Sequence, residues 1–372
     1  MDRPGFLLGS ITVNPFRKTI DRWLGRGEAS ITVPPMDGAF RPNDLLDSAP
    51  AVMAVPAPDC LAMSAQGLVV SSEHSLFRVD KPGDAALASF DADISALAGL
   101  PDGGVAAGLV DGRIVFLGGQ RNGETLAGSA EVGCITALAA ARDGMLLVAN
   151  GSASNNPVDW KRDLMEKNAT GSLWRLDPAS QARERLAANL AYPYGILEDV
   201  DSIIISESWR CALTRIAPGR TGRTTRVLEN LPAYPSRLSR GDGDAIWLAL
   251  FAPRCQIVEF VLSEDHYRRR MTSQIDPELW VAPTLRAGRV PLEPTQQGGV
   301  TQLGILKPRS PSLSYGLVAR LDGAFRPVAS FHSRAPGHRH GVTSCLATGG
   351  QLFFTAKGDG MIASLASERL GS

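Results

Sequence analysis

The chain has 372 residues, of which 44% are hydrophobic and 20% charged, a composition typical of folded proteins and not of disordered or coiled-coil chains. Its 38 Lys and Arg balance 38 Asp and Glu, so it lacks the basic excess that binds nucleic acid or an anionic membrane. No apolar stretch approaches the ~18 residues that span a bilayer, and no secretory signal opens the sequence. We therefore expect a cytoplasmic protein without nucleic-acid or membrane partners.

Residues 1–50 form an N-terminal extension that lacks the pattern found in the rest of the chain. Within this extension Ser30–Val33 is the best candidate for a strand, and Ile11–Val13 is the alternative. The five cysteines of the chain are scattered and odd in number, which favours reduced thiols over a disulfide framework.

One pattern recurs between residues 51 and 372: a strand of small apolar residues, a polar turn that often contains Gly, a second apolar strand, and a third, basic-apolar strand. Six copies can be placed, beginning at Pro58, Ile94, Thr136, Pro193, Pro235 and Thr343. A repeat of roughly forty residues is typical of a propeller with four-stranded blades, and six blades suffice to close a ring. We therefore predict an all-β fold, a six-bladed β-propeller.

Two insertions interrupt this repeat. Residues 152–170 fall in the third blade and contain the helix-compatible stretch Asp159–Lys167, whereas residues 253–314 form a long, partly helical insertion in the fifth blade. The longer insertion is either a lid over the axial pocket or a peripheral decoration, and its length favours the lid.

The last copy of the repeat supplies only three strands, which would leave an unpaired sheet edge. We expect Ser30–Val33 to pair with Met361–Leu365, so that the two ends of the chain close the ring.

Several phrases in the later copies carry a resemblance: LAYPYGI, SESWR, LPAYPSRL, IWLALFAP, SYGLVARLDG and RHGVTS. The sequence resembles the strictosidine synthase-like branch of the six-bladed propellers that also include regucalcin and the gluconolactonases. In the lactonase members a divalent cation, commonly calcium, is held on the axis by Glu, Asn and Asp. The matching positions here are Asp59, Thr136, Tyr194 and Ser236. Because only Asp59 is a carboxylate, we expect no cofactor and at most weak binding of calcium.

Strictosidine synthase itself uses no metal, and the resemblance implies a glutamate base at the start of the last inner strand. That position corresponds to Thr343 here, so a reaction of this kind would need Glu207 or a carboxylate of the long insertion, such as Glu264 or Asp265, as its base. No motif for binding a nucleotide cofactor is present.

The remaining candidates have alternative roles. Asp59 can orient a water, bind a substrate amine or pair with Arg237. His340 is either a general base or a hydrogen-bonded loop residue, and Tyr194 either stacks on a substrate or plugs the channel. Asn156 can donate a carbonyl oxygen or cap a turn, and Trp209 is interpreted as packing between blades.

The leading hypothesis is an enzyme that hydrolyses a lactone or related cyclic ester in a pocket on the propeller axis. The alternatives are a metal-independent lyase of the strictosidine synthase kind and a non-catalytic propeller that binds a small molecule or a protein. The candidate catalytic residues are Asp59, His340 and Glu207. The candidate substrate-binding residues are Tyr194, Ser236, Arg237, Thr136, Thr343 and Asn156.

Overall fold

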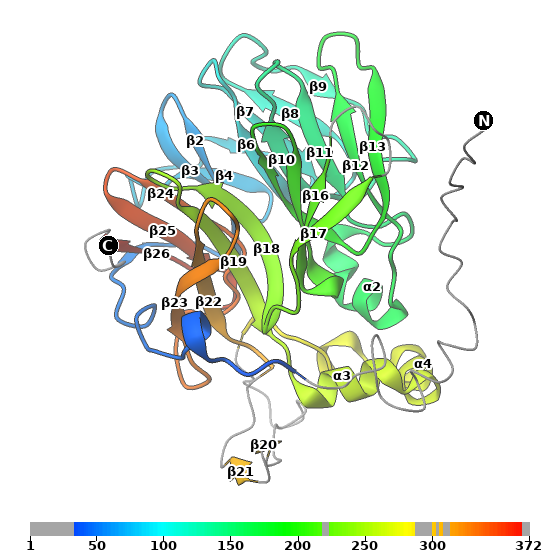
Figure 1. Cartoon of the computed structure of the whole chain (residues 1–372). Helices are drawn as coiled ribbons and strands as arrows, with labels where there is room; N and C mark the ends of the chain where they lie inside the picture. Colours follow the sequence, from blue (N-terminus) through cyan, green and yellow to red (C-terminus); the bar gives the residue numbers. More distant parts are fainter. Residues whose placement is uncertain (1–32, 218–222, 287–299, 303–304, 308–312, 367–372) are drawn as a thin grey trace, which may run out of the picture.

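A computed structural model describes residues 33–217, 223–286, 300–302, 305–307 and 313–366 of the chain. Within these residues the strands form six four-stranded antiparallel sheets and one two-stranded sheet (Figure 1). The innermost strands contact one another in the order β2, β6, β10, β14, β18 and β24, and β24 returns to contact β2. The predicted six-bladed β-propeller is thus confirmed.

The strands of each blade follow from the axis outward. Blades one to three are β2 (Pro58–Ser64), β3 (Gly67–Ser72), β4 (Ser75–Arg78) and β5 (Ala88–Ser89); β6 (Ile94–Gly99), β7 (Val105–Leu109), β8 (Ile114–Leu117) and β9 (Thr125–Leu126); β10 (Ile135–Ala140), β11 (Leu146–Asn150), β12 (Gly171–Leu176) and β13 (Arg183–Leu190). Blades four to six are β14 (Pro193–Glu198), β15 (Ile203–Glu207), β16 (Ala212–Ile216) and β17 (Thr224–Leu228); β18 (Ala233–Arg240), β19 (Ile246–Pro253), β22 (Gly316–Leu321) and β23 (Pro327–Ser333); β24 (Cys345–Thr348), β25 (Gln351–Ala356), β26 (Met361–Ala366) and β1 (Ala51–Ala54).

The second strand of most blades is buried along its whole length. Every residue of β7, β15 and β19 is buried, because each sheet packs against one neighbouring blade on each of its two faces. Small residues permit this close packing: a Cβ at Gly108 would come within 2.7 Å of Ile135 Cγ2 in the next blade. The runs of small apolar residues in the repeat are therefore the strands that face neighbours on both sides.

The ring is closed by β1, not by the predicted Ser30–Val33. In the sixth blade Ala51 pairs with Ala363 and Ala54 with Met361, so β1 occupies the free edge of β26. Residues 30–32 lie outside the described residues, as does the alternative Ile11–Val13. The prediction chose the wrong segment because a four-residue strand directly before the first blade carries too little alternation to stand out in the sequence.

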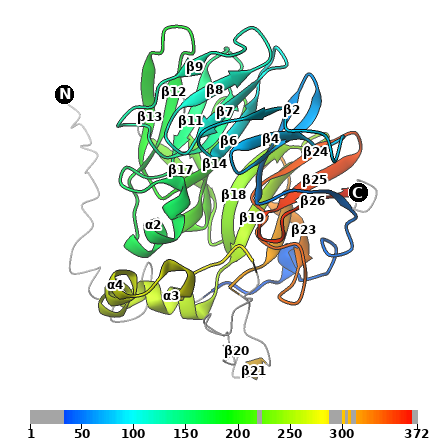
Figure 2. The ribbon, with the colours of Figure 1, turned by 180° about the vertical axis from the view of Figure 1, so that it is seen from behind.

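The insertion in the third blade contains η3 (Pro157–Asp159) and α2 (Trp160–Glu166). Between β19 and β22 the chain forms α3 (Gln256–Ser263), α4 (Asp265–Gln274), η5 (Pro277–Leu279), β20 (Val300–Gln302) and β21 (Ile305–Lys307). Both views of the ribbon place α2, α3 and α4 at the same end of the propeller (Figures 1 and 2).

The two insertions contact each other through side chains. The guanidinium carbon of Arg162 lies 5.4 Å from the centre of the Trp280 ring. Lys161 Nζ lies 3.6 Å from Glu278 Oε1. The shorter insertion is therefore held between the propeller and the longer one.

Two further short helices follow second strands, η4 (Ser208–Arg210) after β15 and η6 (Lys357–Asp359) after β25, and η2 (Gly38–Phe40) precedes β1. The five cysteines are buried free thiols. None of the helices in the described ranges combines the length and apolarity needed to cross a bilayer.

Candidate axial site

A pocket of about 320 Å³ lies at one end of the propeller axis. Every blade contributes to its wall at least one residue from the connection between its second and third strands. In blade order these residues include Glu73, Val110, Trp160, Trp209, Leu285 and Lys357. Because the end of a second strand lies beside the start of the first in an antiparallel hairpin, the inner strands add Asp59, Ser95, Thr136 and Tyr194 from the same end.

Aromatic rings make up one side of this pocket. Tyr192 stacks on Trp209 with ring centres 4.4 Å apart, and Tyr194 meets Phe251 edge-on at 5.8 Å. Trp160 from α2 packs edge-on against Phe251 at 5.5 Å. All five rings line the pocket, so it offers apolar ring surface to a small molecule.

Three residues of the pocket wall have unusual backbone conformations. Ala57, Glu73 and Tyr192 have φ values of 42°, 50° and 56°, in the left-handed region that non-glycine residues seldom occupy. Strained backbone of this kind gathers at functional sites, where the surrounding structure holds it in place.

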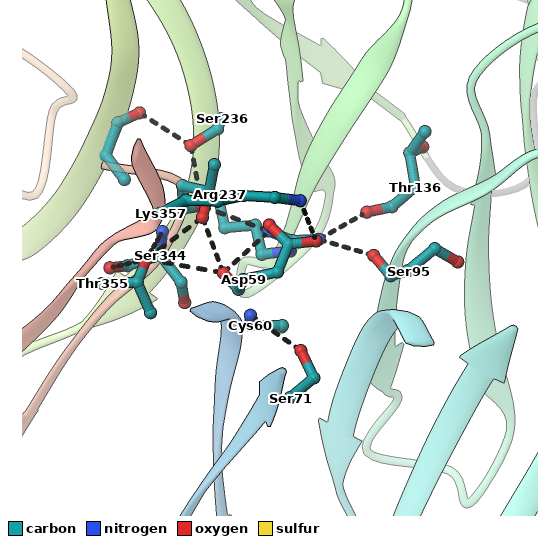
Figure 3. Close-up of polar contacts among 12 residues, drawn as sticks. Asp59, Cys60, Ser71, Ser95, Thr136, Ser236, Arg237, Ser344, Thr355 and Lys357 are labelled. Atoms are coloured by element: carbon teal, nitrogen blue, oxygen red, sulfur yellow. Dashed lines mark hydrogen bonds and ion pairs between the residues drawn. The ribbon is translucent and has the colours of Figure 1, made fainter. Parts of the chain in front are cut away.

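Asp59 in the pocket wall forms a buried ion pair with Arg237, which does not itself line the pocket (Figure 3). Arg237 and Asp59 are each only 6% exposed. Arg237 Nη1 lies 3.1 Å from Asp59 Oδ1, and Nη2 lies 3.4 Å from Oδ2. Of the three roles that the sequence left open for Asp59, the structure therefore shows the pairing with Arg237.

Lys357 is a second cation at the same carboxylate. Its Nζ lies 3.4 Å from Asp59 Oδ2, and its side chain is 28% exposed. Burial alone would raise the pKa of Asp59, but the charges of Arg237 and Lys357, with hydrogen bonds from Arg237 and Thr343, outweigh burial and lower it to about 2. Asp59 is therefore an ionised anchor for two cations.

The side chains at the four positions that match the lactonase metal ligands, Asp59, Thr136, Tyr194 and Ser236, do not fit a divalent metal ion. The hydroxyl of Ser236 donates to the backbone carbonyl of Thr343 at 2.8 Å, and the hydroxyl of Thr136 donates to that of Pro193 at 2.5 Å. Both side chains are thus engaged with the backbone, Asp59 is paired with Arg237, and the described residues include no cluster of three metal-binding side chains. The guanidinium of Arg237 and the ammonium of Lys357 beside Asp59 would also repel a metal cation.

His340, expected as a general base, lies outside this pocket. Its side chain is fully buried, with Nδ1 2.9 Å from Ser314 Oγ and Nε2 2.9 Å from the carbonyl oxygen of Arg334. Because a carbonyl only accepts, Nε2 donates to it, and Nδ1 is hydrogen-bonded to the serine hydroxyl. The structure therefore gives His340 the role of a hydrogen-bonded loop residue.

Glu207 also lies outside the pocket, where it forms a buried ion-pair cluster in the fourth blade. It pairs with Arg210. Its Oε1 accepts from Thr214 Oγ1 at 2.5 Å and from Arg226 Nη1 at 2.7 Å, and Oε2 accepts from the amide of Ala191 at 2.8 Å. With both oxygens in use, Glu207 is not placed to act on a substrate in the axial pocket.

Two of the six predicted substrate-binding residues line the pocket, whereas Ser236, Arg237, Thr343 and Asn156 are not part of its wall. Thr136 and Tyr194 line the pocket, and the Tyr194 ring lies 4.8 Å from the guanidinium carbon of Arg237. Thr343 is buried with its hydroxyl donating to the carbonyl of Asp59 at 2.8 Å. Asn156 caps η3 by accepting from the amide of Val158, and its amide group donates to the carbonyl of Val110.

Lys357, Glu73 and Asp93 are pocket residues that the sequence analysis missed. The signal was present in the repeat, because the segments GLVVSSE and QLFFTAK end on Glu73 and Lys357 after equivalent second strands. Trp209 does pack at the blade interface, but it faces the pocket as well.

Comparisons with known proteins agree on the fold. No protein-family model matches the chain. A gluconolactonase from Xanthomonas campestris superposes with a TM-score of 0.53 at 15% identity, covering 85% of this chain and 87% of that one. A second gluconolactonase candidate superposes with a TM-score of 0.52 at 11% identity, covering 86% and 91%. The chain has the fold of the gluconolactonase-like propellers.

A curated relative matches only part of the sequence. The adipocyte plasma membrane-associated protein of Danio rerio is 25% identical over 128 residues, which cover 33% of this chain. The chain spans 31% of the length of that relative.

Proposed function

We propose that this chain is a metal-independent hydrolase that opens a lactone or related cyclic ester in the axial pocket. The observation that carries the proposal is the ammonium of Lys357, which lines a pocket walled by aromatic rings and built from all six blades. The fold shared with a gluconolactonase supports this choice of reaction by analogy. The pairing of Asp59 with two cations in place of a metal ion is also in keeping with the strictosidine synthase-like branch, to which we propose the chain belongs.

The chemistry assigns a role to each charged group of the pocket. Lys357 donates to the carbonyl oxygen of the lactone and stabilises the negative charge that develops there. A water oxygen adds to the carbonyl carbon while its proton passes to Glu73 or Asp93, the exposed carboxylates of the wall. The bond from the carbonyl carbon to the ring oxygen then breaks, and that oxygen takes the proton.

Asp59 is not the base in this scheme. A carboxylate whose pKa is about 2 holds a proton too weakly to remove one from water near neutral pH. Its role is to orient Lys357, so it is a positioning residue.

The test is proton release from a panel of sugar and aliphatic lactones, with added calcium and with a chelator. We expect turnover that the chelator leaves unchanged. Lys357→Met should lower kcat/KM by roughly 100-fold, the usual loss for one oxyanion donor. The matched control is Lys81→Met, which changes an exposed lysine away from the pocket. Turnover that the chelator abolishes, or that Lys357→Met retains, would contradict the mechanism.

A non-catalytic small-molecule binder is the second candidate. It is favoured by the pairing of Asp59 with Arg237, which engages this carboxylate and leaves the five aromatic rings as a large part of the contact surface. Trp160 and Trp209 in that wall report occupancy through their fluorescence. Quenching by a lactone without any hydrolysis would support this candidate over the enzyme.

A further inference from the structure

We propose that the guanidinium of Arg237 is a built-in cation on the propeller axis that ties all six blades together. Arg237 projects from β18 of the fifth blade. It reaches the carboxylate of Asp59 in the first blade and the carbonyls of Ser95 and Thr136 in the second and third, at 2.6 and 3.2 Å. It also contacts the ring of Tyr194 in the fourth blade and the carbonyl of Thr343 at the sixth, 3.3 Å away. Figure 3 shows Arg237 together with Asp59, Ser95 and Thr136.

The contacts of Arg237 form a cage of oxygen atoms. Its Nη1 contacts three oxygens: the backbone carbonyl of Asp59 at 3.3 Å, Oδ1 of Asp59, and the backbone carbonyl of Thr343. Its Nη2 contacts three more: Oδ2 of Asp59 and the backbone carbonyls of Ser95 and Thr136. The set has six oxygens from four residues, and two of the oxygens belong to the Asp59 carboxylate. A hard divalent cation takes ligands of this type and number. The guanidinium occupies the centre of that set.

Arginine suits this position better than a point charge would. Its planar group presents donors in fixed directions, so one side chain can reach partners on different blades. Burial disfavours the charged form, but Asp59 beside it raises the pKa of Arg237 above its usual value. Its Nε is buried without a hydrogen-bond partner among the described residues, so the contacts are made by the two terminal nitrogens.

Two consequences follow, neither of which depends on lactone hydrolysis. The wild-type protein should gain no stability from calcium, because its axial position is already filled. Removing the arginine side chain should weaken the ring and leave an oxygen-lined space that calcium can enter.

The experiment measures thermal unfolding with calcium chloride and with a chelator. Wild type should unfold at one temperature in both. Arg237→Ala should unfold roughly 5 °C lower in chelator and recover part of that loss in calcium. The double variant with Asp59→Asn should show no recovery, because its cage lacks the carboxylate.

The matched control is Arg240→Ala on the same strand, where the arginine is 46% exposed and pairs with Asp199 at the surface. It should unfold close to wild type. If Arg237→Ala unfolded at the same temperature as this control, the proposal that Arg237 ties the blades together would be overturned. If calcium did not raise the unfolding temperature of Arg237→Ala, the proposal that these oxygens form a cage for a cation would be overturned.

Calcium titration calorimetry of the wild type keeps the proposal testable if Arg237→Ala does not fold. We expect no binding heat. Stoichiometric calcium binding that Asp59→Asn abolishes would show that a metal ion, and not Arg237, is the axial cation.

Discussion

Replacing Asp59 with asparagine removes one charge from the axis while keeping the shape of the side chain. Arg237 and Lys357 both face this carboxylate, at 3.1 and 3.4 Å. In the variant the buried guanidinium loses its counter-ion, and breaking a buried pair from one side costs about 3–5 kcal/mol. We expect the free energy of unfolding at pH 7 to fall by that amount.

The same carboxylate makes stability depend on pH. A pKa lowered from 3.8 to about 2 in the folded protein corresponds to roughly 2 kcal/mol. Because the unfolded chain binds the proton more readily, this stabilisation is present above the unfolded pKa and is lost as the pH falls towards 2. The stability difference between wild type and Asp59→Asn should therefore shrink below about pH 4.

Urea unfolding of the two proteins at pH 7, 5 and 3 measures this difference. His332 contributes a separate slope, because its burial lowers its pKa to about 4 and its stabilisation is lost between about pH 6.5 and 4. That slope is common to both proteins and cancels in the difference. A difference that stays constant from pH 7 to 3 would refute the assigned role of the Asp59 charge.

Two further substitutions separate structural roles from catalytic ones. Glu207→Gln should cost about 2 kcal/mol in urea unfolding, because its charged hydrogen bonds are lost, and should leave kcat/KM unchanged; a loss of turnover in the folded variant would return Glu207 to the active site. Trp209→Phe keeps an aromatic ring but removes the 2.7 Å hydrogen bond from the indole Nε1 to the fully buried Asp163, which should lower the free energy of unfolding by about 1.5–3 kcal/mol. It should speed amide hydrogen exchange in α2, and unchanged exchange there would show that the bond does not hold the insertion.

The blade repeat could be predicted from the sequence because each second strand packs on both faces. That environment requires unbroken runs such as VAAGL and IWLALFAP, which stand out against glycine-containing turns. The closing strand β1 could not be found in this way, since only one of its four residues is buried. Its position is set by pairing with Met361–Ala366 at the other end of the chain.

The site was only partly predictable for a different reason. Matching the inner strands to the metal-ligand positions of the lactonase propellers located Asp59, Thr136 and Tyr194, which line the pocket. The repeat does not specify which way a side chain turns. Arg237 follows the aligned Ser236 and was a candidate ligand contact, yet it lies across the axis and contacts the other five blades.

The sixth blade also determines when the propeller ring can close during synthesis of the chain. Its outer strand β1 is made early, whereas β24, β25 and β26 are among the last segments of the described chain. At about 5–20 residues per second, a ribosome needs roughly 15–60 s to pass from β1 to β26. During that interval β1 has no sheet to join, and the earlier blades have no closed ring. Propeller closure is therefore a late event that pairs the most distant strands of the fold, the kind of contact that makes folding slow.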